Sequence, residues 1–497
     1  LFDRAAAATW QGSPAGVQAL FKPDPDQFLS VRDTFANDLS IQPYLNNFIS
    51  NHTPVIEIGD IDRDGRIDLV SGGTRKDPTR ILTADGRTIS LDQPSAAAVS
   101  ALRLQDLNGD GYPELILGRS SYATVSARSM LEIWDNQAGR GFRQRTEGMP
   151  AVAVNVGCLA VDGADKSDGF QRIFVGSRVR SQRFPQADPS RMLVFDAGGR
   201  FVKEEALPPG DAQGMLTGAA FVDMGIGAGR VLVTVGEFEP LRTLVRGKEG
   251  WMAAPGFGAL AGSSGWWNTL VASDLDGDGD EDLVAGNYGL NTQFRVDSAH
   301  PMSIRHGDFD KNGKDEAITS YYIGGVSYPA HSLDDLIEQL PILRKRYNTY
   351  SSYAEVTTDK MFTGEEQARG KVMQATEMRT MIFEQMGGGN GWRLHPLPVG
   401  AQLAPVFAVA ATDVDGDGRK DLLLGGNQSL TRIRYGRYDA AAFTALKNLG
   451  GWKFAVYPEV QAGLTLQGDV RGLKASPDGR SFWLGVYGRG VEKYIRP

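Results

Sequence analysis

Five segments of the chain repeat one nine-residue pattern of acidic residues, Asp-x-Asp/Asn-x-Asp/Asn-Gly-x-x-Asp/Glu. A hard cation such as Ca²⁺ binds six to eight oxygen atoms, and one tight loop of alternating carboxylates can supply most of them. Positions 1, 3, 5 and 9 of the pattern offer side-chain oxygens, and position 7 offers its backbone carbonyl. The glycine at position 6 allows the sharp turn, because it has no side chain to forbid positive φ. The pattern therefore predicts five calcium loops.

The candidate metal ligands are the residues at positions 1, 3, 5, 7 and 9 of each loop. They are Asp60, Asp62, Asp64, Arg66 and Asp68; Asp106, Asn108, Asp110, Tyr112 and Glu114; Asp274, Asp276, Asp278, Asp280 and Asp282; Asp308, Asp310, Asn312, Lys314 and Glu316; and Asp413, Asp415, Asp417, Arg419 and Asp421. About five Ca²⁺ ions are expected. Their ten positive charges would bring the formal net charge from −8 to +2, so the acidity of the chain belongs mostly to these loops.

Short apolar runs flank the loops, which distinguishes them from EF-hands, where helices flank the loop. Val55–Ile58 precedes the first loop and Leu69–Gly72 follows it, and Leu422–Gly425 follows the last. Short runs of apolar residues bounded by turn residues are typical of β-strands. Each unit is therefore predicted to be a β-hairpin whose turn folds around an ion.

The same hairpin recurs with most ligands missing after Asp162, Asp223 and Asp469. Eight hairpins then begin near residues 60, 106, 162, 223, 274, 308, 413 and 469. A period near fifty residues is typical of β-propellers, in which small antiparallel sheets stack around an axis. We predict an all-β, calcium-binding β-propeller of eight blades by hairpin count, or of seven if the hairpins at 274 and 308 share one blade. Calcium is not expected at the Asp162 and Asp223 turns.

The propeller is predicted to span residues 47–497, with a small helical insertion at about 331–370. Ser332 ahead of Leu333–Leu340, and Thr363 three residues before Glu366, are typical helix starts, and Pro341 should end the first helix. The insertion is either a solvated lid over a blade edge or a docking element for a partner. Residues 1–46 form an N-terminal segment, of which Leu39–Leu45 is expected to pair with the last blade and close the ring.

The repeated loop, followed by a strand that ends in glycine, resembles the FG-GAP/VCBS propeller repeat of integrin α-subunit heads. Four flanking segments are similar to bacterial VCBS-repeat proteins related to cartilage acidic protein, namely Asn37–Leu45, Ser263–Leu270, Gly286–Phe294 and Gly436–Asp439. The resemblance covers roughly residues 33–497. It implies a propeller exported from the cytoplasm, often within a larger exported chain or an outer-membrane complex, and it implies little about function.

Calcium loops of this kind would fill from the millimolar calcium outside the cytosol, so an extracytoplasmic location is expected, either secreted, on the cell surface or associated with an outer membrane. No apolar stretch reaches the length of a membrane span, and no basic stripe indicates nucleic-acid binding. The expected function is a calcium-stabilised binding or scaffold propeller that presents loops to a protein or glycan partner.

The alternative function is a carbohydrate-active enzyme, with a polysaccharide lyase as the first choice. The chain has no zinc-protease motif and no nucleophile elbow, and no catalytic or cofactor-binding residue is assigned. Asn287, Tyr288, Asn291 and Arg295, beside a calcium loop, are candidates for a sugar site, although strand-end and turn residues would look the same. Trp266–Trp267 could stack on a sugar ring, but adjacent strand residues point to opposite faces, so one of the two is expected in the core.

Overall fold

The described strands pair into eight antiparallel sheets, seven with four strands and one with a fifth. The structure is a computed structural model that describes residues 19–497 apart from 125–128, 164–167, 211–212, 225–229, 255–259, 261, 459–461 and 465. Helices are few, and no helix of the described chain is both long and apolar enough to cross a bilayer. The predicted all-β class is confirmed, and the eight predicted hairpins correspond to the eight sheets.

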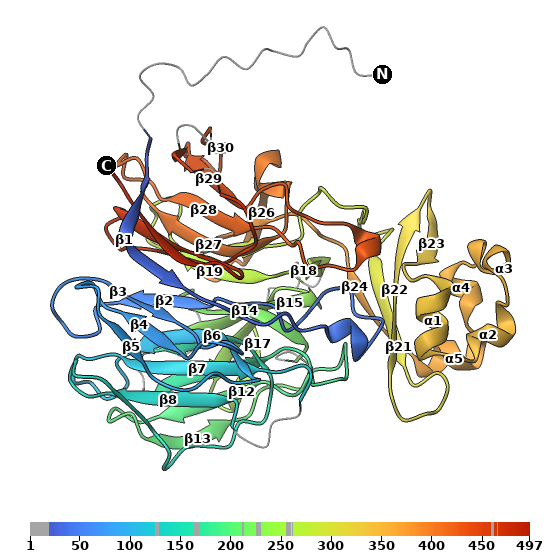
Figure 1. Ribbon diagram of the computed structural model, residues 1–497, viewed down its shortest axis with the longest axis horizontal. Coiled ribbons are helices and arrows are strands. Elements are labelled where there is room, and N and C mark those ends of the chain that lie inside the picture. The colour runs from blue at the N-terminus through green and yellow to red at the C-terminus, as the bar shows by residue number, and fades with distance from the viewer. Residues whose placement is uncertain are drawn as a thin grey trace, which may run out of the picture.

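Seven of the sheets form a closed ring, the β-propeller (Figure 1). Their first strands contact one another in the order β2, β6, β10, β14, β19, β27 and β31, and β31 returns to β2. A separate buried apolar cluster fills each of the seven spaces between neighbouring blades. Each blade thus buries both of its faces, which a single small antiparallel sheet cannot do alone.

The strands of the ring are grouped by blade in the following order. They are β2 (Ile56–Gly59), β3 (Asp68–Ser71), β4 (Arg80–Leu82) and β5 (Thr88–Ser90); β6 (Ala98–Gln105), β7 (Glu114–Ser120), β8 (Leu131–Asn136) and β9 (Phe142–Gln144); β10 (Val156–Asp162), β11 (Gln171–Ser177), β12 (Arg191–Phe195) and β13 (Phe201–Glu205); β14 (Met215–Val222), β15 (Val231–Glu239), β16 (Arg242–Gly247) and β17 (Gly250–Ala253), with β18 (Gly265–Trp266); β19 (Thr269–Ser273), β20 (Asp282–Gly286), β25 (Met381–Gln385) and β26 (Trp392–Pro396); β27 (Val406–Thr412), β28 (Asp421–Gly426), β29 (Phe443–Asn448) and β30 (Phe454–Val456); and β31 (Val470–Ala475), β32 (Ser481–Val486), β33 (Gly490–Ile495) and β1 (Lys22–Ser30).

The eighth sheet lies outside the ring, at the right of Figure 1. It consists of β21 (Met302–Gly307), β22 (Glu316–Ile323), β23 (Val326–Pro329) and β24 (Lys371–Ala375), and it is inserted between β20 and β25. The ring therefore has seven blades, the smaller of the two predicted numbers. The hairpin at 308 does not share the blade that begins at 274. It starts a sheet of its own, and β25 and β26 complete the interrupted blade afterwards.

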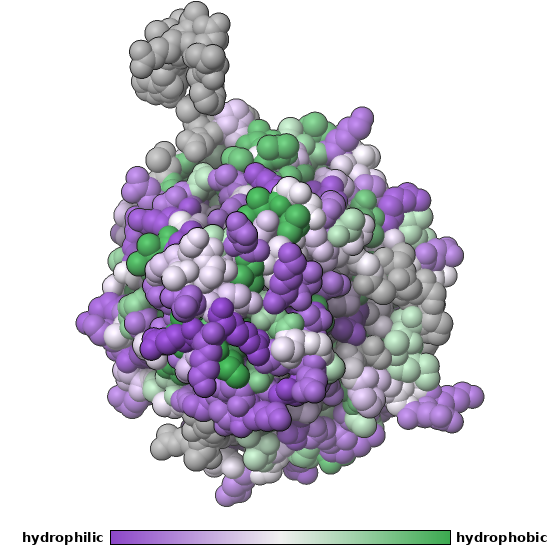
Figure 2. Space-filling view, turned by 90° about the vertical axis from the view of Figure 1, so that its right-hand side faces the viewer, coloured by the Kyte–Doolittle hydropathy of each residue, from purple (hydrophilic) through white to green (hydrophobic). Residues whose placement is uncertain are grey.

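The insertion also contains five short helices, which lie beyond its sheet (Figure 1). They are α1 (Leu333–Gln339), α2 (Leu343–Arg346), α3 (Tyr350–Ala354), α4 (Thr358–Met361) and α5 (Gly364–Arg369). The predicted caps are confirmed, because the side chains of Ser332 and Thr363 each accept a hydrogen bond from a backbone N–H in a complete capping box. Pro341 directly follows the C-cap of α1, as predicted. The side of the molecule that carries the insertion shows mostly hydrophilic side chains (Figure 2).

The ring is closed by a strand from the N-terminal part of the chain, but not by the expected segment. Strand β1 pairs antiparallel with β33, from Lys22 opposite Ile495 to Ser30 opposite Gly490. Leu39–Leu45 instead forms a short 3-10 helix (η2, Asp38–Ser40) followed by turns. Tyr44 and Leu45 are fully buried there, and the Tyr44 hydroxyl donates to the backbone carbonyl of Leu336 in α1. Burial against the insertion therefore replaces strand pairing.

Candidate metal sites

Every predicted loop joins the first two strands of a sheet. The loops that begin at Asp60, Asp106, Asp274 and Asp413 follow the inner strands β2, β6, β19 and β27 of the ring. Inner strands of a propeller run in one direction along the axis, so these four loops lie on the same face of the ring. The fifth loop, at Asp308, joins β21 to β22 in the insertion.

The carboxylate at position 1 organises each turn by accepting hydrogen bonds from loop backbone. One oxygen always accepts from the N–H of the position-6 glycine, at 2.9–3.2 Å. All five of these glycines have φ between 82° and 95°, a region that side chains rarely adopt. Glycine is therefore needed at position 6 for this N–H to point toward the position-1 carboxylate. The positive φ expected from the sequence is confirmed.

The acid at position 9 is buried in every loop, with exposed fractions of 0–2 %. One of its oxygens accepts from the backbone N–H of the position-2 residue at 2.8–3.1 Å. The position-2 residue is itself a buried apolar side chain that anchors the turn to the core; these residues are Ile61, Leu107, Leu275, Phe309 and Val414. Packing and hydrogen bonding together hold the last carboxylate under the loop.

Positions 1, 3 and 9 converge in four of the five loops, where one ligand atom from each acid lies within 4.8 Å of the others. The four groups are Asp60, Asp62 and Asp68; Asp274, Asp276 and Asp282; Asp308, Asp310 and Glu316; and Asp413, Asp415 and Asp421. The Asp106 loop differs because position 3 is Asn108, whose amide nitrogen donates to Asp110 and Glu114 at 3.1 Å each. Three convergent carboxylates form an oxygen site suited to a hard divalent cation.

Position 5 lies at the exposed rim of each loop rather than in the convergent group. Its side-chain oxygen accepts from the backbone N–H of position 7 at 2.8–3.0 Å. At position 7 only the backbone carbonyl was predicted to bind metal, and two of the side chains form ion pairs with position 5 instead. Arg66 pairs with Asp64 at 2.6 Å and Arg419 with Asp417 at 2.5 Å. Metal ligation by each of the five positions stays a prediction.

Burial makes the position-9 acids hard to ionise while no cation is bound. It raises the pKa of Glu114, Asp282 and Glu316 to about 7, and that of Asp421 to about 6. The pKa of Asp68 is raised for the same reason. Nearby loop carboxylates add to the effect, because a second negative charge disfavours ionisation. A bound divalent cation would remove both penalties.

Amide side chains from the next blade form hydrogen bonds with several loops. The nine-residue pattern does not predict these contacts. Asn136, at the end of β8, donates to the position-2 carbonyl of Ile61 at 3.0 Å, and Asn448, at the end of β29, donates to that of Leu275 at 2.8 Å. Gln171 donates likewise to Leu107 at 2.8 Å. We call these three side chains the blade clamps. Two of the three could be recognised in the sequence. Asn136 and Asn448 each end the third strand of a blade and are followed by a turn that contains glycine.

The candidate sugar residues do not form an open site. Asn287 and Tyr288 are fully buried, and the Tyr288 ring stacks on Trp266 with centroids 4.2 Å apart. Trp266 and Trp267 are both buried, in two different apolar clusters, so the core holds both and not one as expected. These four side chains build the fold and do not line a carbohydrate-binding surface. Asn291 and Arg295 are exposed, and the Asn291 amide donates to the Leu403 carbonyl at 3.1 Å.

The hairpins at Asp162 and Asp223 have the predicted strands, β10–β11 and β14–β15. Residues 164–167 and 225–229, within their turns, lie outside the described residues. Beside the first hairpin, the guanidinium of Arg172 pairs with Asp168 at 2.6 Å and with Glu205 at 3.0 Å. The Arg172 guanidinium thus lies beside a turn whose sequence lacks most of the acidic residues of the nine-residue pattern.

No protein-family model and no curated protein matches the chain. Among solved structures, the Pan2 WD40 domain of Neurospora crassa is similar over 90 % of this chain and 91 % of its own, at 11 % identity and a TM-score of 0.43. BBS1N, solved in complex with ARL6DN, is 12 % identical over 97 % of this chain and 98 % of its own, with a TM-score of 0.40. A chain of the mitotic checkpoint complex is 10 % identical over 100 % and 98 %, with a TM-score of 0.44. Likenesses this distant do not indicate a function.

Proposed function

We propose that the protein is a calcium-stabilised binding platform, a rigid propeller that presents loops to a protein or glycan partner outside the cytoplasm. The observation that carries the proposal is the repeated loop geometry, with three acids converging within 4.8 Å in four separate loops. Carboxylates crowded in this way repel one another unless a cation neutralises them. The resemblance of the loops to FG-GAP/VCBS repeats supports calcium as that cation and an extracytoplasmic location.

Four of the six residues considered for a sugar site are buried, which removes the sequence-based argument for a carbohydrate-active enzyme. Asn287, Tyr288, Trp266 and Trp267 are packed in the core and are not available to a substrate. What remains on the loop face is a set of turns held in fixed positions by buried acids and blade clamps. Turns fixed by a rigid scaffold are suited to recognition, because little conformational entropy is lost when a partner binds.

The proposal is tested in two steps on the full chain. Metal analysis of protein dialysed in calcium should find about five ions per chain, and chelation should remove them and lower the melting temperature. A glycan array probed with calcium and then with chelator should next show whether any bound glycan depends on the ions. A product assay on each positive glycan separates binding from cleavage. Protein that retains no calcium at millimolar concentration would refute the proposal.

A further inference from the structure

Two of the loops present the same ligand side chains to a metal. The Asp274 and Asp413 loops both have Asp at positions 1, 3, 5 and 9 and Gly at positions 4 and 6. Both also bring positions 1, 3 and 9 within 4.8 Å. The loops differ at positions 7 and 8, which are Asp280 and Glu281 in one and Arg419 and Lys420 in the other, and in the residues around them. Any difference in their affinity for a cation must come from these residues.

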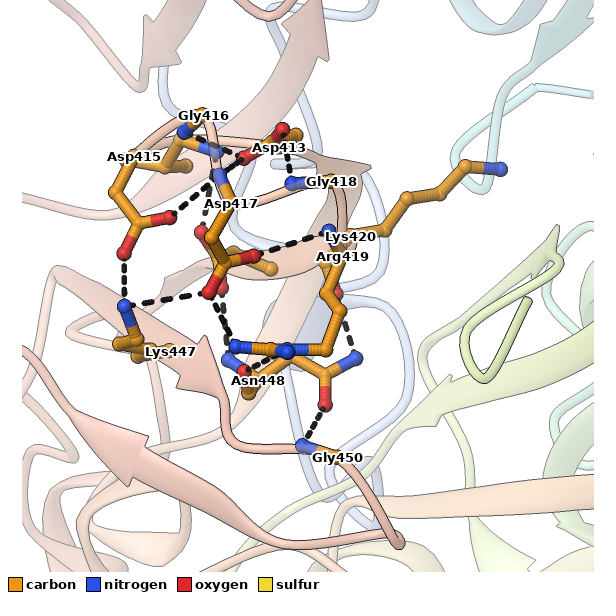
Figure 3. Close-up of polar contacts among 12 residues, drawn as sticks. Asp413, Asp415, Gly416, Asp417, Gly418, Arg419, Lys420, Lys447, Asn448 and Gly450 are labelled. Carbon is orange, nitrogen blue, oxygen red and sulfur yellow. Dashed lines mark hydrogen bonds and ion pairs between the residues drawn. The ribbon is translucent and has the colours of Figure 1, made fainter.

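A lysine side chain contacts the Asp413 loop from outside it. Lys447, on β29, directs its ammonium group to the carboxylate of Asp415, with which it forms a hydrogen bond, and lies 3.4 Å from that of Asp417 (Figure 3). The hydroxyl of Tyr457 also donates to Asp415, at 3.0 Å. The ammonium thus bridges positions 3 and 5, two carboxylates that the loop would offer to calcium.

The other loops lack this arrangement within the described residues. No ion pair there involves Asp274, Asp276, Asp278 or Asp282. At the Asp60 loop, the guanidinium of Arg87 lies 3.8 Å from Asp62, and its side chain is 63 % exposed. Arg66 and Arg419, at position 7 of their loops, each pair with position 5 alone, whereas position 7 of the Asp274 loop is Asp280. Lys447 differs from both arginines because its ammonium contacts positions 3 and 5 together.

We propose that Lys447 is an internal competitor for the cation of the Asp413 loop, so that this loop fills with calcium after the others. The inference rests on the proposed function, because it presupposes that the loops bind calcium. An ion that takes oxygens from Asp415 and Asp417 must displace the ammonium, and two cations on one pair of carboxylates repel each other. An interaction of this kind at a partly exposed site changes affinity by up to about fivefold.

The same contact explains how the loop would stay ordered without metal. Lys447 neutralises part of the charge at positions 3 and 5, as Arg172 neutralises Asp168 and Glu205 beside the Asp162 hairpin. Calcium binding would exchange one counter-ion for another and release the lysine ammonium to solvent. The Asp413 loop would thus respond to calcium at concentrations where the Asp274 loop is already full.

The test compares Lys447→Met with Lys420→Met in calorimetric calcium titrations of metal-free full-length protein. Lys420 is the matched control, since its ammonium donates to Ser273 at 3.0 Å and forms no ion pair with a described loop carboxylate. The wild type and K420M should show one site up to about fivefold weaker than the rest. In K447M that weak site should tighten to the range of the others, and in D413N it should be lost.

A second readout uses the wild type alone and does not depend on the folding of a variant. Amine acetylation, followed by mass spectrometry of the peptide with Lys447, should increase as calcium fills the weak site. The inference is wrong if K447M titrates like K420M, or if Lys447 stays protected while the Asp413 loop is occupied. If no loop of the wild type takes up calcium, the proposed function itself has failed, which is a different result.

Discussion

The metal-free protein should be more stable at pH 5 than at pH 7, because of the buried acid at position 9 of each loop. The pKa of Glu114, Asp282 and Glu316 is raised to about 7 and that of Asp421 to about 6, from ordinary values of 3.8 for Asp and 4.5 for Glu. An acid whose pKa is raised by folding imposes no penalty below its unfolded pKa. The penalty grows as pH rises toward the folded pKa and is constant above it. The relevant window is therefore pH 4 to 7.

The size of the effect follows from the shifts. At about 1.4 kcal/mol for each pKa unit, every one of these acids costs the metal-free folded state roughly 3 to 4.5 kcal/mol above pH 7. The side chains are at most 2 % exposed, so solvent screens the penalty little. Burial also lowers the pKa of His52 to about 4 and that of His331 to about 3, which stabilises the folded state as pH rises and offsets part of this cost. A remaining third of the summed cost, about 5 kcal/mol, is comparable to the stability of a whole domain.

The assay is thermal unfolding by circular dichroism from pH 4.5 to 8, after metal removal on a chelating resin. The melting temperature of the metal-free protein should fall as pH rises. With calcium the slope should reverse, because a bound cation favours the ionised acid and protons compete with it at low pH. Asp282→Asn should reduce the slope of the metal-free profile by about a third, because the other buried acids remain. Asp278→Asn, at the exposed rim, should reduce it much less, since Asp278 raises the pKa of Asp282 only through its charge. A metal-free melting temperature that is constant or rises between pH 5 and 7 would refute the reasoning.

Three further results are expected. Calcium at a hundredfold excess over its Kd should stabilise the metal-free protein by about 2.7 kcal/mol per filled site, and a melting curve that calcium does not shift would contradict this. Asn448→Ala removes a blade clamp from a buried carbonyl and should cost about 1–3 kcal/mol in chemical denaturation, while Asn390→Ala in an exposed turn should cost little. Deleting residues 1–30 removes β1 from the last blade and should lower the melting temperature with the calcium content unchanged; a truncated chain that melts like the full one would show that β1 does not stabilise the ring.

The loops could be predicted from sequence because their geometry is local. Nine consecutive residues supply the capping carboxylate, the glycine and the buried acid, and the flanking apolar runs determine the hairpin. Asp274 to Asp282 illustrates this, since every hydrogen bond of position 1 stays within the loop. The eight hairpins and the all-β class follow from the repetition of that unit.

The number of blades and the closing strand depend on contacts between distant residues, which the pattern does not contain. The insertion separates β20 from β25 by nearly one hundred residues. In the sequence, the two halves of this blade therefore look like two incomplete repeats. Strand β1 contains Pro23, Pro25 and several charged residues, and it resembles a linker more than a strand. It pairs nonetheless because it lies at a sheet edge, where proline is tolerated, and because Leu29 is buried between two blades.

Lys447 and the blade clamps could not be predicted for a similar reason. Lys447 lies 30 residues after Asp417 in the sequence, and only the pairing of β28 with β29 brings it to the loop. Asn448 contacts a loop of the preceding blade, 173 positions away. Contacts of this kind depend on how strands pair and blades pack in the ring, and the nine-residue repeat does not contain that information.

An anomalous-difference map from crystals grown in millimolar calcium tests the central claim most directly. We expect a peak in each of the loops at Asp60, Asp106, Asp274, Asp308 and Asp413, with oxygen atoms about 2.3–2.6 Å from each ion. The turns at Asp162 and Asp223 should show none. A map without a peak at the Asp274 loop, or with a strong peak at Asp223, would contradict the assignment of these loops as calcium sites.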